Sequence, residues 1–135
     1  MDVAKLVASW SKDPSSKIGA IIVKDMEIKS TGYNGFPKGI EDLQERLNNR
    51  AVKYKLMVHA ERNALIQAGK DSREASLFIY GLPPCSECTK QIIQAGIKEV
   101  IVCNQDVPER WKEEFIISTG MLNEAGVDLR TIKYE

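Results

Sequence analysis

Two short stretches decide the fold and the chemistry of this chain: His59-Ala60-Glu61 and Pro83-Pro84-Cys85-Ser86-Glu87-Cys88. His59 is the only histidine in the sequence. Each stretch lies at a predicted junction from strand or loop to helix. Unpaired N–H groups and the helix dipole stabilise negative charge there, which lowers the pKa of a thiol. Because Cys85 and Cys88 are three residues apart, both sulfurs are expected to face the same way from the first helical turn.

Two thiolates and one imidazole form a ligand set that suits zinc. Three protein ligands leave the fourth tetrahedral position for a water molecule, as a catalytic zinc site requires, and zinc-bound water ionises near neutral pH. We therefore predict that His59, Cys85 and Cys88 hold one catalytic Zn²⁺ per chain. Glu61 is predicted to be the catalytic residue, first taking the proton of the water and then donating it. The order H-x-E…P-C-x-x-C is an established signature of zinc nucleobase deaminases.

Two other interpretations of the cysteines stay open. A Cys-x-x-Cys pair can be a redox motif, although Ser86-Glu87 lacks a thioredoxin-like context. Cys103 ends an apolar segment and is expected to be a small buried hydrophobic residue. If Cys103 were instead a fourth zinc ligand, the metal would be structural and the protein a non-catalytic zinc-binding module.

The pattern around the two stretches predicts an α/β fold. After residue 58, helices and strands alternate, which favours parallel crossovers. These helices are expected at 59–68, 86–95 and 109–125, and the strands at 77–80, 100–103 and 127–133. Before residue 58 we expect a helix over 2–11, with Val3, Leu6, Val7 and Trp10 on its apolar face, and strands over 18–23 and 28–33. This opening hairpin makes the sheet mixed. Residues 34–39 are predicted to be a loop, and residues 41–57 a surface helix with a break near Asn48 and Asn49.

Composition excludes several classes of protein. The chain has 135 residues, 43% of them hydrophobic, which suits one globular domain over residues 1–135. Nineteen basic and nineteen acidic residues give no net charge, which disfavours a nucleic-acid partner. Since the sequence has no 18-residue apolar run, we expect no membrane association. The N-terminus lacks the apolar core of a signal peptide, so we expect a cytoplasmic protein with reduced thiols.

The sequence resembles the cytidine and deoxycytidylate deaminase family, and within it the deoxycytidylate (dCMP) deaminases. The resemblance is carried by four blocks: Ser11–Ala20, the GYNGxP-like loop within Thr31–Pro37, the HAExNAI-like segment His59–Leu65, and Pro83–Val102. It implies a three-layer α/β/α sandwich around a mixed five-stranded sheet. It also implies hydrolysis of dCMP to dUMP and ammonia, which supplies dUMP for thymidylate synthesis. In this chemistry a zinc-bound hydroxide attacks C4 while Glu61 protonates N3.

The resemblance also implies substrate contacts. Ala60 and Pro84 would line the pyrimidine pocket, while Asn34, with Gly35 beside it, would contact the sugar. A 5′-phosphate needs cations nearby, and each candidate has the alternative of being a solvated surface charge. The basic candidates are Lys17, Lys38, Arg46, Arg50 and Arg62.

Further expectations concern assembly, regulation and rival substrates. Relatives are often homo-oligomers, frequently hexamers, regulated by dCTP and dTTP, so the resemblance implies a homo-oligomer with these effectors as candidates. Val58 stands where many relatives have cysteine, and without a spare histidine a second, structural zinc is not expected. Deamination of another nucleoside or nucleotide remains the alternative activity.

Overall fold

A mixed five-stranded sheet forms the centre of the computed structural model, which describes residues 1–103 and 106–134. The strand order is β2-β1-β3-β4-β5. The strands are β1 (Gly19–Lys24), β2 (Glu27–Tyr33), β3 (Ser76–Tyr80), β4 (Glu99–Cys103) and β5 (Asp128–Ile132). β1 runs antiparallel to both β2 and β3, whereas β3, β4 and β5 are parallel. The predicted mixed sheet, with its opening hairpin, is therefore confirmed.

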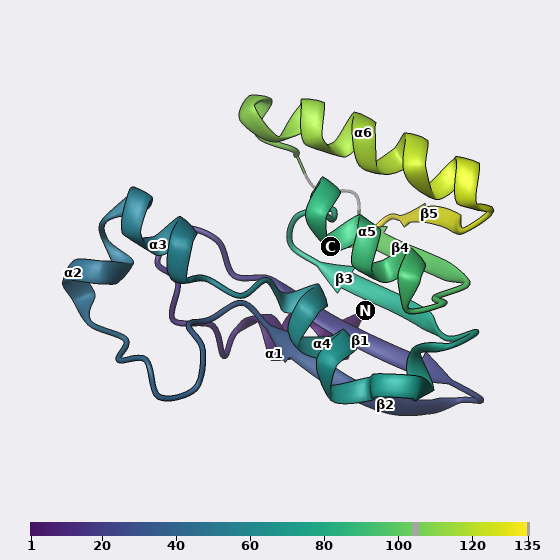
Figure 1. Ribbon diagram of the computed structural model, residues 1–135, viewed down its shortest axis with the longest axis horizontal. Helices are drawn as coiled ribbons and strands as arrows, with labels where there is room; N and C mark the ends of the chain where they lie inside the picture. The colour runs from purple at the N-terminus through teal and green to yellow at the C-terminus, as the bar shows by residue number, and fades with distance from the viewer. Residues whose placement is uncertain (104–105, 135) are drawn as a thin grey trace.

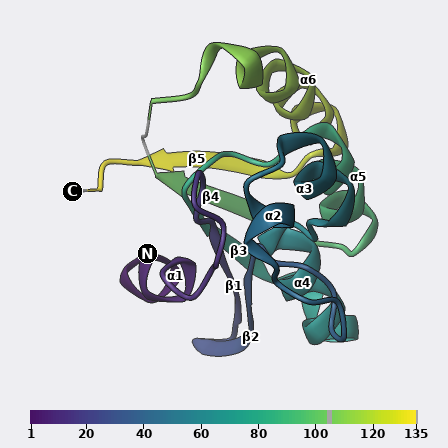
Figure 2. The same ribbon diagram turned by 90° about the vertical axis from the view of Figure 1, so that its left-hand side faces the viewer.

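Helices cover both faces of the sheet, as the predicted three-layer sandwich requires (Figure 2). One face packs against α4 (Ala60–Ala68), α5 (Ser86–Gln94) and α6 (Glu109–Ala125), which contribute Ala64, Ile92 and Leu122 to the larger core. The other face packs against α1 (Asp2–Ala8) through Ala4 and Val7. A short 3₁₀ helix, η1 (Gly69–Ser72), follows α4 and was not predicted. Within the described residues, no helix combines the length and the apolar character that a membrane span needs.

The helix α1 is shorter than predicted, and its buried face differs. Ala4, Val7 and Ala8 are buried, whereas Val3, Leu6 and Trp10 are 42%, 58% and 51% exposed. The predicted apolar face was therefore wrong except for Val7. The reason is close packing on β1, because a Cβ added to Gly19 would lie 2.7 Å from the backbone nitrogen of Ala8. Only the small side of α1 can approach the sheet this closely.

A second glycine brings α4 against β2. A Cβ added to Gly32 would lie 2.5 Å from the backbone nitrogen of Ala64, and the Ser30 hydroxyl donates a hydrogen bond of 2.7 Å to the Ala64 carbonyl. His59 is the residue at which α4 begins its first turn. The contact between Gly32 and α4 therefore sets the position of both His59 and Glu61.

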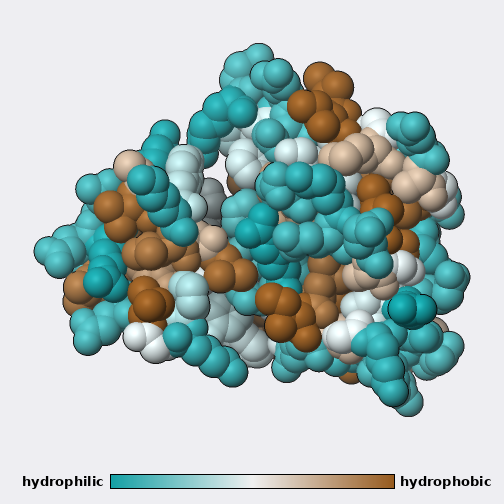
Figure 3. Space-filling model, in the orientation of Figure 1, coloured by the Kyte–Doolittle hydropathy of each residue, from teal (hydrophilic) through white to brown (hydrophobic). Residues whose placement is uncertain are grey.

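The predicted helix over residues 41–57 is two short helices, α2 (Gln44–Leu47) and α3 (Arg50–Leu56), interrupted at Asn48 and Asn49 as expected. They form a lobe at one end of the molecule (Figure 1). Apolar patches are visible on this lobe (Figure 3). In the loop before α2, Ile40 and Leu43 are exposed. The lobe is not a solvated surface throughout, because Lys53 of α3 is buried.

Candidate active site

The three predicted zinc ligands come together at the ends of two helices. His59 caps the N-terminus of α4, and Cys85 caps the N-terminus of α5, with Cys88 in the first turn. The His59 Nδ1 atom lies 3.2 Å from the Cys88 sulfur and 3.5 Å from the Cys85 sulfur. All three ligand atoms lie within 4.8 Å of one another. Tetrahedral zinc with Zn–N and Zn–S bonds of about 2.0–2.3 Å needs ligand atoms at about this separation, so the site fits the metal.

Hydrogen bonds among the three ligand side chains shift their pKa values in different directions. Hydrogen bonds from the Cys88 thiol and from His59 lower the pKa of Cys85 to about 4. A hydrogen bond to the Cys85 sulfur and burial raise the pKa of Cys88, and the hydrogen bond with Cys85 raises the pKa of His59. In the absence of a metal, these shifts favour one thiolate, at Cys85, beside a neutral Cys88 thiol and a protonated His59. Because a metal binds the deprotonated forms of these side chains, its binding would release protons from Cys88 and His59.

Glu61 lies in the first turn of α4 and is 4% exposed. Burial raises the pKa of its carboxyl group, while the positive charge of His59 opposes this effect. Glu61 is not one of the three clustered ligands, which leaves its carboxylate for proton transfer.

A cavity of about 290 Å³ opens beside the zinc ligands. His59, Ala60 and Glu61 line one part of it, together with Asn34 from the loop after β2. Other residues of the wall come from segments far apart in the sequence: Asp13, Ser15, Ser16, Ile18, Arg50, Lys53, Tyr54, Met57, Leu82, Pro83, Arg110 and Trp111. A nucleotide-sized molecule bound in this cavity would therefore lie against His59 and Glu61.

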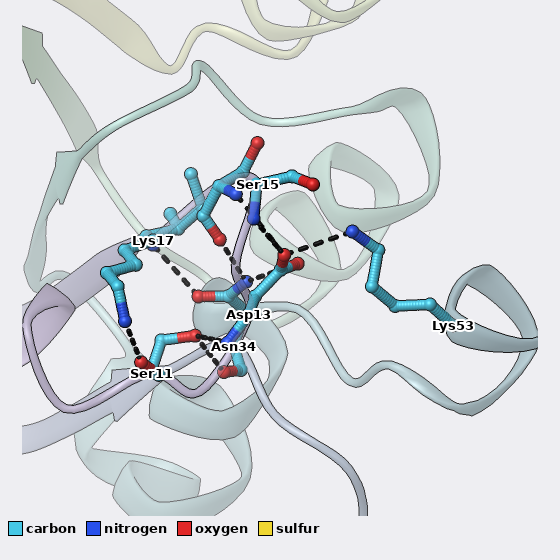
Figure 4. A network of polar contacts seen from close by, with 8 residues as sticks. Ser11, Asp13, Ser15, Lys17, Asn34 and Lys53 are labelled. Carbon is cyan, nitrogen blue, oxygen red and sulfur yellow. Dashed lines mark hydrogen bonds and ion pairs between the residues drawn. The ribbon is translucent and has the colours of Figure 1, made fainter. Parts of the chain in front are cut away.

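Polar contacts hold the Asn34 side chain in this wall (Figure 4). Its Oδ1 atom accepts a hydrogen bond of 2.8 Å from the Ile18 N–H, and its Nδ2 donates one of 2.8 Å to the Ser16 carbonyl. The neighbouring Asp13 carboxylate accepts hydrogen bonds from Asn34 Nδ2 at 3.4 Å and from the Ser15 N–H at 2.8 Å. The loop that precedes β1 and the loop that follows β2 are thus joined at the cavity.

Lys53 completes this network and was missed by the sequence analysis. Its Nζ atom lies 3.0 Å from the Asp13 carboxylate, and the two side chains are only 7% and 6% exposed. The ion pair therefore fastens α3 to the loop before β1 across 40 positions of the chain. No local pattern distinguishes Lys53 from the exposed Lys55 on the same helix, because its burial depends on Asp13.

Only some of the other predicted substrate residues line the cavity. Arg50 lines the cavity, whereas Pro84 is buried behind it and Pro83 lines it instead. Gly35 bridges to Val58, with N–H···O distances of 3.1 and 2.8 Å, and so supports the segment before His59. The basic candidates that do not line the cavity are Lys17, Lys38, Arg46 and Arg62.

Three of those cations have other surroundings. The Lys17 ammonium donates a hydrogen bond to the Ser11 carbonyl, and Arg46 donates one of 3.2 Å to the Glu41 carbonyl. Lys38 is exposed in the loop before α2. Arg110 and Trp111 line the cavity instead. Both lie in α6, where the sequence contains no recognisable motif.

Cys103 lies apart from the metal ligands. It is buried at the end of β4, and the cluster of possible ligands within the described residues does not include it. Strand alternation places it on the opposite face of the sheet from Val102, which packs in the core beneath α4 and α5. The position of Cys103 disfavours the zinc-module interpretation and agrees with its expected role as a small buried residue.

Comparisons with known proteins agree with this geometry. Residues 1–104 match the family described as the cytidine and deoxycytidylate deaminase zinc-binding region. An uncharacterized deaminase in the luxG 3′ region of Aliivibrio fischeri is 40% identical, over 94% of this chain and 86% of that protein. Deoxycytidylate deaminase of Homo sapiens is 39% identical, over 96% of this chain and 75% of that protein. The crystal structure of dCMP deaminase from the cyanophage S-TIM5 with dCMP and dUMP is similar, with a TM-score of 0.75, 30% identity and coverage of 97% and 92% of the two chains.

Proposed function

The chain belongs to the cytidine and deoxycytidylate deaminase family, and from this premise we propose that its substrate is dCMP, which it hydrolyses with water to dUMP and ammonia. The observation that carries this proposal is the composition of the cavity wall. The cavity is lined by His59 and Glu61, and also by two exposed arginines, Arg50 and Arg110. Two relatives named for dCMP, one human and one from a cyanophage, support the choice of substrate.

The zinc-binding residues and Glu61 divide the chemistry between them. His59, Cys85 and Cys88 would hold the zinc ion, which would supply a water molecule activated for attack on C4. The Glu61 carboxylate takes a proton from this water and donates it to N3 of the cytosine. A second proton transferred through Glu61 allows the 4-amino group to leave as ammonia. The burial of Glu61 keeps bulk water away from these transfers.

The sugar and the phosphate have separate candidate partners. Asn34 Oδ1 accepts one hydrogen bond from Ile18, which leaves a lone pair for a sugar hydroxyl. Lys53 is neutralised by Asp13, so it is a poor phosphate ligand. Arg50, whose guanidinium carbon lies 6.0 Å from the centre of the Tyr54 ring, and Arg110 carry exposed cations at the cavity. We assign the 5′-phosphate to these two arginines.

The test is deamination of dCMP, deoxycytidine and CMP by the zinc-loaded protein, followed by ultraviolet absorbance. We expect a strong preference for dCMP over deoxycytidine. Because a charge-assisted hydrogen bond contributes about 1.5–3 kcal/mol, Arg50→Ala and Arg110→Ala should each lower kcat/KM for dCMP by about 10- to 100-fold. Neither substitution should change kcat/KM for deoxycytidine. Lys38→Ala removes an exposed cation outside the cavity and serves as the control.

Other outcomes would revise the proposal at defined points. Equal turnover of dCMP and deoxycytidine would remove the phosphate assignment and leave the deamination chemistry in place. If none of the three is deaminated, the substrate is a different nucleotide or base, and dCMP is excluded.

A further inference from the structure

The helix α6 contacts the zinc-ligand segment on both sides of Cys85. The Trp111 indole Nε1 donates a hydrogen bond of 3.0 Å to the Pro83 carbonyl. The Glu114 carboxylate accepts a hydrogen bond of 2.8 Å from the Ser86 N–H. Trp111 and Glu114 are three residues apart on α6, so they share one face of that helix. Two residues of one helix therefore hold the backbone two residues before Cys85 and directly after it.

The bond from Ser86 satisfies a backbone group that α5 itself leaves unpaired. The Ser86 N–H is the first of this helix, and N–H groups of a first turn have no partner within the helix. Within the first turn, the Cys88 N–H donates a hydrogen bond of 3.4 Å to the Cys85 sulfur. The Ser86 N–H instead has its acceptor on α6. A carboxylate at a helix N-terminus is also favoured by the helix dipole. The hydrogen bond from the Ser86 N–H correspondingly lowers the pKa of Glu114.

We propose that Trp111 and Glu114 are positioning residues that hold Cys85 and Cys88 in the geometry that binds zinc. The proposal rests on the zinc-dependent function proposed above and extends it to a part of the chain that the family match does not cover. That match ends at residue 104, whereas α6 begins at Glu109. We call the hydrogen bonds from Trp111 to Pro83 and from Ser86 to Glu114 the α6 clamp, since they hold a site whose ligands lie in other elements.

The clamp also connects metal binding with the substrate cavity. Trp111 lines the cavity and donates its indole N–H to Pro83, which lines the same cavity. Movement of α6 would therefore displace the cavity wall and the zinc-ligand turn together. Glu114 does not line the cavity, so its replacement tests the metal-positioning role without a direct effect on substrate contacts.

The decisive measurement is zinc affinity, obtained by competition with a chromogenic chelator. Because partners that orient metal ligands typically contribute 10- to 100-fold in affinity, Glu114→Ala should weaken zinc binding about tenfold or more. Glu114→Gln keeps an oxygen that accepts the Ser86 hydrogen bond and should restore most of the affinity. Glu113→Ala removes the same charge from an exposed position of α6 and should bind zinc like the unmodified protein. Trp111→Phe, which keeps a ring but loses the donor, should also weaken zinc binding.

Wild-type zinc affinity in Glu114→Ala would overturn the proposal. Equal weakening in Glu113→Ala would also overturn it, because the effect would then be one of net charge. If Glu114→Ala does not fold, as judged by circular dichroism, then Glu114→Gln and Trp111→Phe decide the question. Loss of affinity in Trp111→Phe with retention in Glu114→Gln supports the clamp, whereas unchanged affinity in Trp111→Phe contradicts it. None of these measurements uses dCMP, so a protein that binds zinc but does not deaminate dCMP would refute the proposed function alone.

Discussion

At the scale of single residues, Glu61 combines burial with a position beside the metal ligands. Glu61→Gln keeps the size of the side chain and removes its ability to carry a proton. A positioned acid–base group typically contributes 10²- to 10⁴-fold, so we expect deamination to fall by about 10³-fold or more. Zinc content, measured by atomic absorption, should be unchanged because Glu61 is not in the ligand cluster. An active Glu61→Gln protein would end the proton-transfer assignment.

Lys53 lies in a segment that was predicted to be a surface helix, yet its side chain is buried against Asp13. Lys53→Met leaves the buried Asp13 carboxylate without its ion-pair partner. Breaking a buried pair by removing one member costs about 3–5 kcal/mol, and the N–H groups of Ser15 and Ser16 compensate part of this for Asp13. We expect a loss of about 3 kcal/mol in the free energy of unfolding, measured with urea. Lys55→Met, at an exposed position of the same helix, should change it by less than about 0.5 kcal/mol. Similar losses in both variants would show that the ion pair is not responsible.

At the scale of elements, the sequence predicts best where local signals suffice. The β-branched strands and the helices opened by His59 and Cys85 were predicted to within one or two residues, because hydrophobic periodicity and helix-start signals are local. The face of α1 was mostly mispredicted because its burial depends on Gly19, a partner in another element. The burial of Lys53 depends in the same way on a residue 40 positions away.

The close contact between β2 and α4 can be tested by replacing Gly32 with alanine, with Gly120 in α6 as the comparison. Gly32→Ala would force a methyl group against the backbone of α4 near Ala60 and Ala64. Overpacking of this kind typically costs about 1–3 kcal/mol, and because α4 carries His59 and Glu61, activity should fall as well. Gly120 lies in α6 with open space around its added Cβ, so Gly120→Ala should stabilise the protein by up to about 1 kcal/mol. Thermal unfolding of both variants, together with kcat for dCMP, measures these effects. Gly32→Ala with unchanged stability and kcat would show that α4 adjusts freely.

At the scale of the whole molecule, the site is assembled from segments that the sequence keeps apart. The zinc ligands could be predicted because thiolate and imidazole chemistry in helix-opening positions is recognisable in short motifs. Arg50 was also among the predicted basic residues, but Lys53 and Arg110 were not, because only the fold brings α3 and α6 to the same cavity. Lys38 and Arg46 show the converse, since proximity in sequence to a motif-bearing loop did not bring them to the cavity.

A zinc ion held by His59, Cys85 and Cys88 would connect α4 to α5, so its removal should loosen the larger core as well as abolish activity. A ligand present at a thousand times its dissociation constant stabilises the native state by about 4 kcal/mol. For a chain of this size, that corresponds to a decrease in Tm on the order of 10 °C when a chelator removes the metal. Differential scanning calorimetry with and without chelator, followed by addition of zinc, measures this decrease and its reversal. Cys103→Ser should show the same decrease, because Cys103 lies outside the ligand cluster. An unchanged Tm after verified loss of zinc would show that the two helix ends hold their positions without the metal. A Cys103→Ser protein that no longer binds zinc would restore the alternative in which Cys103 is a fourth ligand.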